Sequence, residues 1–347
     1  MKNIIFPWLN VGWTQLHAMR ARLPHAILMC GPSGIGKREL AEYFALALLC
    51  ENPAAGGEPC GECGACRWFA DGNHPDYRAV MPEILQPEIG QSSEGSDETT
   101  VDPGAAKTKS APSKVIKIGQ IRSLDGFFNI GTHRAGRRVV LVYPADALTV
   151  DAGNALLKTL EEPPADTLFL LVASRLNDVL PTVRSRCAKL LLARPEPAPV
   201  LAWLKAQGVA DPVTALAEAG GAPLAASTAD PAADFRDILI AALGGGRAID
   251  PVALAEKCEK AGAANLTAWL TRWVSDLALS KCRQDVRYHP RSAPVIAAAA
   301  AKMHTPALHK YYRRLVQMRR VADHPLNSRL FAEELLIDYA RLAASGS

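Results

Sequence analysis

The sequence lacks any long apolar run. Its longest nearly uncharged stretch, around Ala293–Ala301, falls well short of the ~18–20 consecutive apolar residues that a membrane-spanning helix needs. The apolar run near the N-terminus contains a lysine and is interrupted by Pro7 and Asn10, so no secretory signal is visible. We therefore expect a cytoplasmic protein that has no contact with a membrane.

A strong excess of charge of either sign is also missing. The net charge is +4 over 347 residues, which permits contact with nucleic acid but does not argue for it. Hydrophobic residues make up 49% and charged residues 21%, a balance that excludes wholesale disorder. A chain of this length exceeds one ordinary core, so two or three domains are expected. In a cytoplasmic protein the eight cysteines are expected to be thiols or metal ligands and not disulfides.

Residues 1–195 alternate strand and helix patterns. Short apolar runs predict buried strands, and the segments between them have helix-forming composition. The strands are expected at 27–31, 138–142 and 168–173, and the helices at 37–49, 118–128 and 151–162. Pro163-Pro164 ends the last of these helices, because proline lacks the donor and clashes with the preceding turn. The alternation predicts an α/β domain with a mostly parallel sheet covered on both faces.

The remaining sequence has a different character. Residues 83–113 are rich in Ser, Thr, Gly, Glu and Pro and are expected to form a disordered surface insertion. Three prolines in 194–199 indicate a linker, and the chain beyond it is Ala-rich with helical periodicity. We expect a small helical domain at 196–235 and an all-helical domain at 236–347.

A glycine-rich loop follows the first strand. Residues 31–37 match G-x-x-x-x-G-K, and a helix follows them. In this pattern Gly31, Gly34 and Gly36 let backbone amides turn toward phosphate oxygens, and Lys37 interacts with the terminal phosphates. A chance glycine-rich turn is the alternative.

The loop lacks its magnesium ligand. Arg38 stands where a Ser or Thr hydroxyl holds the cation in complete loops of this kind. The strand at 138–142 is followed by Tyr143-Pro144, which supplies no carboxylate for the metal or for water activation. Asp146 comes three residues too late and is expected at a helix start or on the surface. We expect no ATP hydrolysis, and weak or absent ATP binding.

Four stretches resemble the delta-prime family of bacterial DNA polymerase III clamp loaders, within the AAA+ class. These stretches are Leu23–Ala26, Asn154–Pro164, Ser185–Cys187 and His324–Asn327. The resemblance covers most of the chain outside 83–113. It implies a P-loop AAA+ domain, a small helical lid domain and a helical collar domain that oligomerises.

The resemblance also implies partners and a role for one arginine. The family forms a ring with three gamma/tau ATPase subunits and a delta subunit, within the DNA polymerase III holoenzyme. The ring loads the sliding clamp onto primer–template DNA. Arg186 matches the arginine that contacts a neighbouring subunit's ATP, a role suited to an always-charged planar guanidinium. A structural ion pair is the alternative for Arg186, and Arg184 would assist it or face solvent.

A further arginine of catalytic relatives is also missing. These relatives carry a nucleotide-sensing arginine in a glycine turn, and here Leu224 stands at that position after Gly220-Gly221. The alternative function, a catalytically active gamma/tau-type ATPase, requires magnesium ligands that this sequence does not provide.

Four cysteines form a C-x9-C-x2-C-x2-C pattern. Cys50, Cys60, Cys63 and Cys66 suit a tetrahedral zinc site, and four protein ligands make such a metal structural. The family carries a zinc module at this place. Free thiols are one alternative, and a zinc-dependent nucleic-acid-binding module is another. We expect the other cysteines to be small buried apolar residues; they are Cys30, Cys187, Cys258 and Cys282.

The segment 281–320 is basic, with ten Lys or Arg and the single acid Asp285. Tyr311 and Tyr312 stand beside cations, a pattern found on nucleic-acid-binding surfaces. Contact with acidic partner subunits, contact with DNA and simple exposure to solvent all stay open. Asn327 is expected to cap the final helix, whose apolar face suits packing. That face consists of Leu330, Phe331, Leu335, Leu336 and Tyr339.

Overall fold

The structure is a computed structural model that describes residues 5–86, 112–129, 131–132, 136–245, 249–322 and 327–344. Contacts divide the chain into two compact units, Met1–Pro199 and Val200–Ser347. Most of the predicted insertion at 83–113 lies outside the described residues. The domain boundaries expected at 195 and 235 stay predictions.

The first unit is built on a five-stranded sheet with the order β2-β3-β4-β1-β5. All neighbouring strands run parallel. The strands are β1 (Ala26–Cys30), β2 (Tyr77–Val80), β3 (Arg138–Val142), β4 (Thr167–Ala173) and β5 (Ala188–Leu191). Every residue of β1, β3 and β4 is buried, as continuous apolar strands require when both faces of a sheet are covered.

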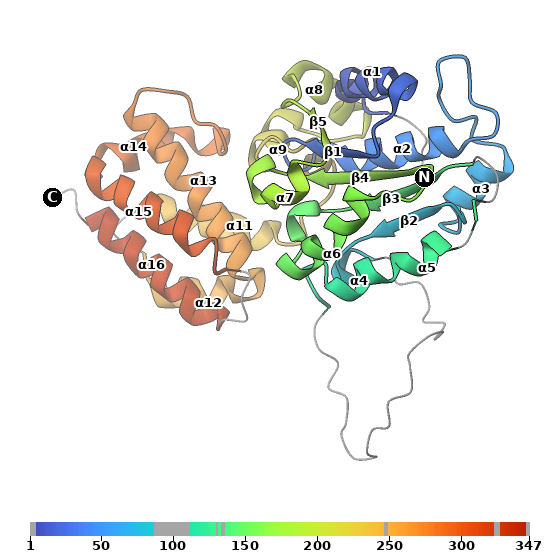
Figure 1. Cartoon of the computed structure of the whole chain (residues 1–347). Coiled ribbons are helices and arrows are strands. Elements are labelled where there is room, and N and C mark those ends of the chain that lie inside the picture. Colours follow the sequence, from blue (N-terminus) through green and yellow to red (C-terminus); the bar gives the residue numbers. More distant parts are fainter. Residues whose placement is uncertain are drawn as a thin grey trace, which may run out of the picture. The chain divides into compact units, whose positions relative to one another are not determined.

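Helices cover both faces of this sheet (Figure 1). Alternate residues of each strand point to opposite faces, so Ile27 and Met29 pack with Phe44 while Leu28 packs with Leu156. The first face carries α1 (Asn10–Met19), α2 (Lys37–Leu49) and α3 (Gly64–Ala70). The second carries α4 (Ile118–Arg122), α5 (Leu124–Asn129), α6 (Val150–Glu161) and α7 (Pro181–Arg184). The expected α/β fold is confirmed.

One predicted helix is two. The apolar pattern of 118–128 predicts a single helix, but α4 ends at Arg122 and α5 begins at Leu124. Ser123 turns its hydroxyl back to the Gln120 carbonyl at 2.8 Å, a local bond that competes with helix continuation. The prediction of one continuous helix is therefore wrong.

The second unit is helical throughout its described part. Helix α8 (Pro197–Ala206) crosses the boundary between the units. The others are α9 (Pro212–Glu218), α10 (Pro223–Ser227), α11 (Ala233–Gly244), α12 (Pro251–Cys258), α13 (Ala263–Lys281), α14 (Ala293–Ala301), α15 (Thr305–Met318) and α16 (Ser328–Ala344). No helix that the structure describes is long and apolar enough to span a membrane.

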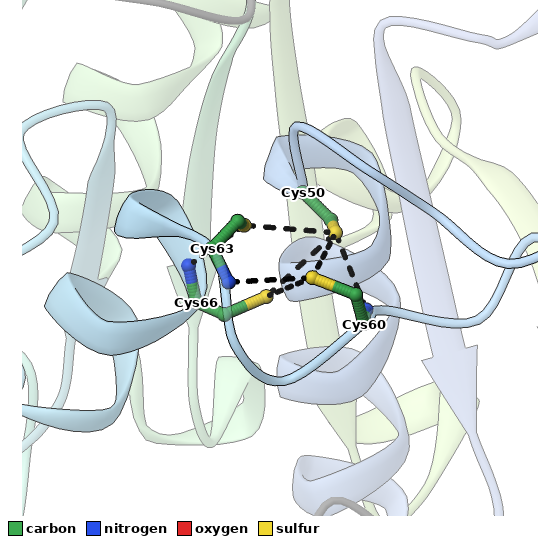
Figure 2. Close-up of side chains that lie close together, drawn as sticks. All are labelled: Cys50, Cys60, Cys63 and Cys66. Atoms are coloured by element: carbon green, nitrogen blue, oxygen red, sulfur yellow. Dashed lines mark hydrogen bonds between the residues drawn. The ribbon is translucent and has the colours of Figure 1, made fainter.

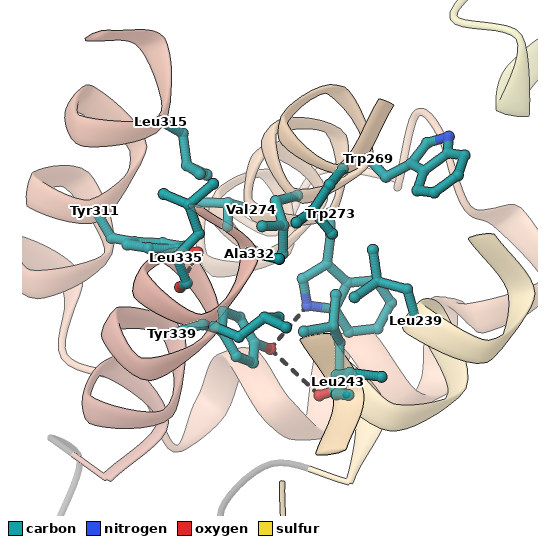
Figure 3. Packing of buried hydrophobic residues seen from close by; sticks show 14 of the residues in the cluster. Leu239, Leu243, Trp269, Trp273, Val274, Tyr311, Leu315, Ala332, Leu335 and Tyr339 are labelled. Carbon is teal, nitrogen blue, oxygen red and sulfur yellow. Dashed lines mark hydrogen bonds between the residues drawn. The ribbon is translucent and has the colours of Figure 1, made fainter. Parts of the chain in front are cut away.

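The core of the second unit centres on two aromatic residues (Figure 3). Trp273 of α13 and Tyr339 of α16 are fully buried, and the indole N–H donates to the phenolic oxygen at 2.8 Å. The phenol in turn donates to the Leu243 carbonyl at 3.2 Å. Asn327 accepts from the backbone N–H groups of residues 329 and 330, which confirms the predicted cap of α16.

Candidate functional site

The glycine-rich loop lies between β1 and α2, as predicted. Gly36 directly precedes α2 with a φ of +91°, and a Cβ at this position would lie 2.5 Å from the Phe6 ring, so glycine is required here. Lys37 is 5% exposed, and its ammonium donates to the Pro32 carbonyl at 2.7 Å. Burial lowers the pKa of Lys37, although the charge of Asp146 opposes this shift. The ammonium group of Lys37 is thus bound to the backbone of the same glycine-rich loop.

Arg38, which stands where a magnesium ligand was expected, contacts two neighbouring side chains. The guanidinium of Arg38 donates to Glu42 at 2.8 Å and lies 5.7 Å from the centre of the Tyr143 ring. Burial raises the pKa of Glu42, against the opposing effect of Arg38. The Glu42 carboxylate is thus held in an ion pair with Arg38, and the expected loss of magnesium stays a prediction.

Asp146 differs from its expected surface position. It belongs to the short helix η4 (Ala145–Ala147), which agrees with the expected helix start, but it is half-buried and not fully on the surface. One carboxylate oxygen accepts from the Ser174 N–H at 3.4 Å, and the other is buried without a hydrogen-bond partner among the described residues. Its charge acts on Lys37, so Asp146 belongs to the loop's surroundings.

Arg186 lies in the turn between α7 and β5. Its Nη1 donates to the Thr182 carbonyl at 2.9 Å and to the Ser185 hydroxyl at 3.3 Å, and its Nη2 pairs with Glu161. The side chain is 33% exposed. The ion pair is the contact that a purely structural role would require, while the exposure leaves the guanidinium accessible to another molecule. Both expected roles are compatible with this position.

The neighbouring Arg184 has its own partner. Its guanidinium donates to the Asn177 side-chain oxygen at 3.0 Å. Arg184 is thus bound to the segment after β4 and does not point freely to solvent, and its assistance to Arg186 stays a prediction.

The four predicted metal ligands lie together (Figure 2). Cys50 follows α2, Cys66 lies in α3, and Cys60 and Cys63 belong to the loop between the two helices. All four sulfur atoms lie within 4.8 Å of one another. Four of the pairs are separated by 3.5–3.9 Å, close to the roughly 3.8 Å that tetrahedral ligands have around a metal with bonds of ~2.3 Å. The cluster can hold a metal ion.

Backbone donors favour the thiolate form of Cys60, whereas burial raises the pKa of Cys50 and Cys66. The N–H groups of Glu62 and Cys63 lower the pKa of Cys60 to about 6. Further N–H groups point at Cys50 and Cys63, at 3.3 and 3.5 Å. Metal ligation requires thiolate, so a bound cation would have to offset the effect of burial on Cys50 and Cys66. Of the other cysteines, Cys30, Cys187 and Cys258 are buried as predicted, but Cys282 is exposed, so that part of the expectation is wrong.

The basic segment is partly neutralised within the chain. Arg291 pairs with Asp211 at 2.9 Å, and Arg314 pairs with Asp338 at 2.7 Å. Tyr311 is buried and donates to the Leu335 carbonyl, so it cannot stack on a base. Only part of the predicted aromatic and cationic pattern is therefore presented at the surface.

Arg272, which sequence reasoning did not select, contacts the glycine turn at 220–221. Both glycines have positive φ, and Arg272 of α13 donates to the Glu218 carbonyl beside them. Burial lowers the pKa of Arg272. Leu224 lies in α10, so the expected leucine follows this turn.

Two family models match the chain. One, described as "DNA polymerase III, delta subunit", covers residues 13–196, and the other, described as "DNA polymerase III, delta subunit, C terminal", covers residues 236–341. The chain belongs to the DNA polymerase III delta-subunit family. Its curated relatives confirm the expected delta-prime type.

The protein named DNA polymerase III subunit delta' from Pseudomonas aeruginosa is 42% identical over 226 residues, which is 64% of this chain and 60% of the relative. The protein of the same name from Yersinia pestis is 36% identical over 231 residues, again 64% and 60%. The match thus spans about 60% of these relatives. A solved gamma-subunit-related protein from Thermotoga maritima is 14% identical, with a TM-score of 0.47 over 95% of this chain and 99% of that one.

Proposed function

We propose that this protein is a non-hydrolysing, delta-prime-type subunit of the DNA polymerase III clamp loader. In this role it joins gamma/tau ATPase subunits and a delta subunit in the cytoplasm and helps load the sliding clamp onto primed DNA. Its association with primer–template DNA is indirect, as part of the assembled complex. Its family membership supports this assignment, and the chemistry of its loop separates it from an ATPase.

The Arg38–Glu42–Tyr143 arrangement carries the non-hydrolysing part of the proposal. Phosphoryl transfer needs a magnesium ion that bridges the phosphates and a group that positions the attacking water. Here a guanidinium and a phenol ring lie beside the loop, and the lysine binds its own backbone. Both features oppose binding of magnesium with ATP.

Arg186 acts on an ATP bound by a neighbouring subunit. Its guanidinium is partly exposed on a turn anchored by buried Val183 and Cys187. An arginine supplied to a triphosphate stabilises the charge of the transition state, an effect worth ~10³–10⁵ in rate in GTPases.

The cysteine cluster holds a structural zinc ion. Four thiolates leave no open position for a substrate or water. Zinc at this site therefore links the segments that carry its ligands and takes no part in catalysis. Its ligands join the end of α2 to α3 through Cys50 and Cys66.

Reconstitution with gamma/tau and delta tests the proposal. Arg186→Ala should lower the ATP turnover stimulated by DNA and clamp while the complex still assembles. Arg194→Ala is a matched control, because Arg194 is exposed on the coil after β5. Unchanged turnover in Arg186→Ala would refute the trans-acting role. Magnesium-dependent ATP turnover by the isolated chain would instead favour a gamma/tau-type ATPase.

A further inference from the structure

Glu161 is the acidic partner of Arg186. It is the last residue of α6, and its carboxylate pairs with Nη2 of the arginine. The two residues are 25 positions apart in the sequence, so the contact depends on how α6 packs beside α7.

A carboxylate at this place is unfavourable for the helix by itself. The C-terminal end of a helix carries partial negative charge, and an acid there typically costs a few tenths of a kcal/mol or more. Glu162 follows at the C-cap, is exposed, and has no side-chain partner among the described residues. The ion pair with Arg186 offsets this cost at Glu161, whereas Glu162 has no such pair.

The helices α6 and α7 approach closely. A Cβ at Gly153 of α6 would lie 2.2 Å from Cδ1 of Leu180, directly before α7. A larger residue at 153 would require the end of the Leu180 side chain to shift. The backbone of Arg186 is also held in place, because its N–H donates to the Val183 carbonyl at 3.1 Å.

The contacts of Arg186 leave part of the guanidinium free. An arginine has five N–H donors, and the bonds to Thr182, Ser185 and Glu161 use three of them. Two donors stay available within the described part of the chain. A phosphate group can therefore bind without displacing Glu161.

We propose that Glu161 is a positioning residue that orients Arg186 for a phosphate of the neighbouring subunit's ATP. This inference rests on the proposed trans-acting role of Arg186. The long side chain of arginine loses rotamer freedom when it is immobilised, and Glu161 restricts it before the phosphate arrives. The pair is exposed to solvent, with side-chain exposures of 33% and 51%, so it contributes little to stability and can adjust as the phosphate binds.

Variants of Glu161 in the reconstituted clamp loader test this role. Glu161→Ala should lower kcat at the site that Arg186 serves by about two- to tenfold, the cost of immobilising one flexible side chain, with KM for ATP nearly unchanged. Glu161→Gln keeps an acceptor oxygen and should recover most of the rate. Glu162→Ala is the matched control and should leave kcat and the melting temperature unchanged.

The double variant separates this inference from the proposed function. If Arg186→Ala lowers turnover and Glu161→Ala adds no further loss to it, the two residues act together as proposed. If Arg186→Ala lowers turnover but Glu161→Ala alone has no effect, or raises kcat, the positioning role is refuted while the trans-acting arginine stands. If Arg186→Ala has no effect, the proposed function itself fails.

Discussion

The guanidinium of Arg38 lies 5.7 Å from the centre of the Tyr143 ring and donates to Glu42 at 2.8 Å. Arg38 directly follows the loop lysine, and Tyr143 directly follows β3. These are the two places from which an ATPase of this class supplies its magnesium ligands. The residues that stand at these two places therefore contact each other.

Arg38→Thr should fail to restore hydrolysis. It returns a hydroxyl to the loop, but no carboxylate follows β3, so magnesium-dependent phosphate release should stay at background. It should also lower the free energy of unfolding by about 1–3 kcal/mol, because Glu42 loses the partner of a mostly buried carboxylate. Denaturant titration measures this loss, and the double variant Arg38→Thr/Glu42→Gln should recover part of it. Phosphate release above background would contradict our account of the site.

The cysteine cluster should contain one zinc ion per chain. Cys63→Ser removes one of four ligands and should release the metal, which a colorimetric chelator detects. At a free zinc concentration 100 times Kd, binding stabilises the folded state by about 2.7 kcal/mol, so the melting temperature should fall as well. Cys282→Ser serves as the control, since this thiol is exposed and outside the cluster. A wild-type protein that carries no zinc and melts unchanged in chelator would rule out the metal.

Local patterns in the sequence predicted much of the fold and of the site. β1, β3 and β4 are fully buried and therefore continuously apolar, which a sequence shows directly. The cysteine cluster spans only residues 50–66, so the spacing of its cysteines in the sequence was enough to predict that they lie together.

The parts that sequence reasoning missed depend on tertiary contacts. The strands β2 and β5 lie at the sheet edges and have mixed burial. Each is only four residues long and contains a charged residue, Arg78 or Lys189, so neither forms a continuous apolar run. The pairing of Glu161 with Arg186 needs the packing of α6 on α7, which no local pattern contains. The Arg38–Glu42 pair, in contrast, has the i, i+4 spacing of a helical ion pair and was accessible from sequence.

Asp211 should make stability depend on pH. Its carboxylate accepts from Thr214 and pairs with Arg291. These contacts lower the pKa of Asp211 to about 2, and the hydrogen bonds from Thr214 have a larger effect than the pair with Arg291. Because an unfolded Asp has a pKa of about 3.9, the folded state gains stability above that pH and loses it as pH falls toward 2. Asp211→Asn should lower the melting temperature at pH 7, and the difference from wild type should shrink below about pH 4.

The control for this titration is Asp285→Asn, an exposed acid of the basic segment, which should shift the melting temperature little at any pH. A constant gap between Asp211→Asn and wild type from pH 7 to pH 3 would show that the carboxylate charge contributes nothing.

Tyr339 should contribute to the second unit through its hydroxyl. The phenol accepts from the Trp273 indole and donates to the Leu243 carbonyl, and all of these groups are buried (Figure 3). Tyr339→Phe keeps the ring but leaves a buried indole N–H without its acceptor, which costs about 1–3 kcal/mol. Equilibrium unfolding followed by tryptophan fluorescence measures the loss. Tyr312→Phe is the matched control, because Tyr312 is 37% exposed and water can replace its hydrogen bonds. Equal effects of the two substitutions would show that the buried hydrogen bonds add nothing to the packing of the ring.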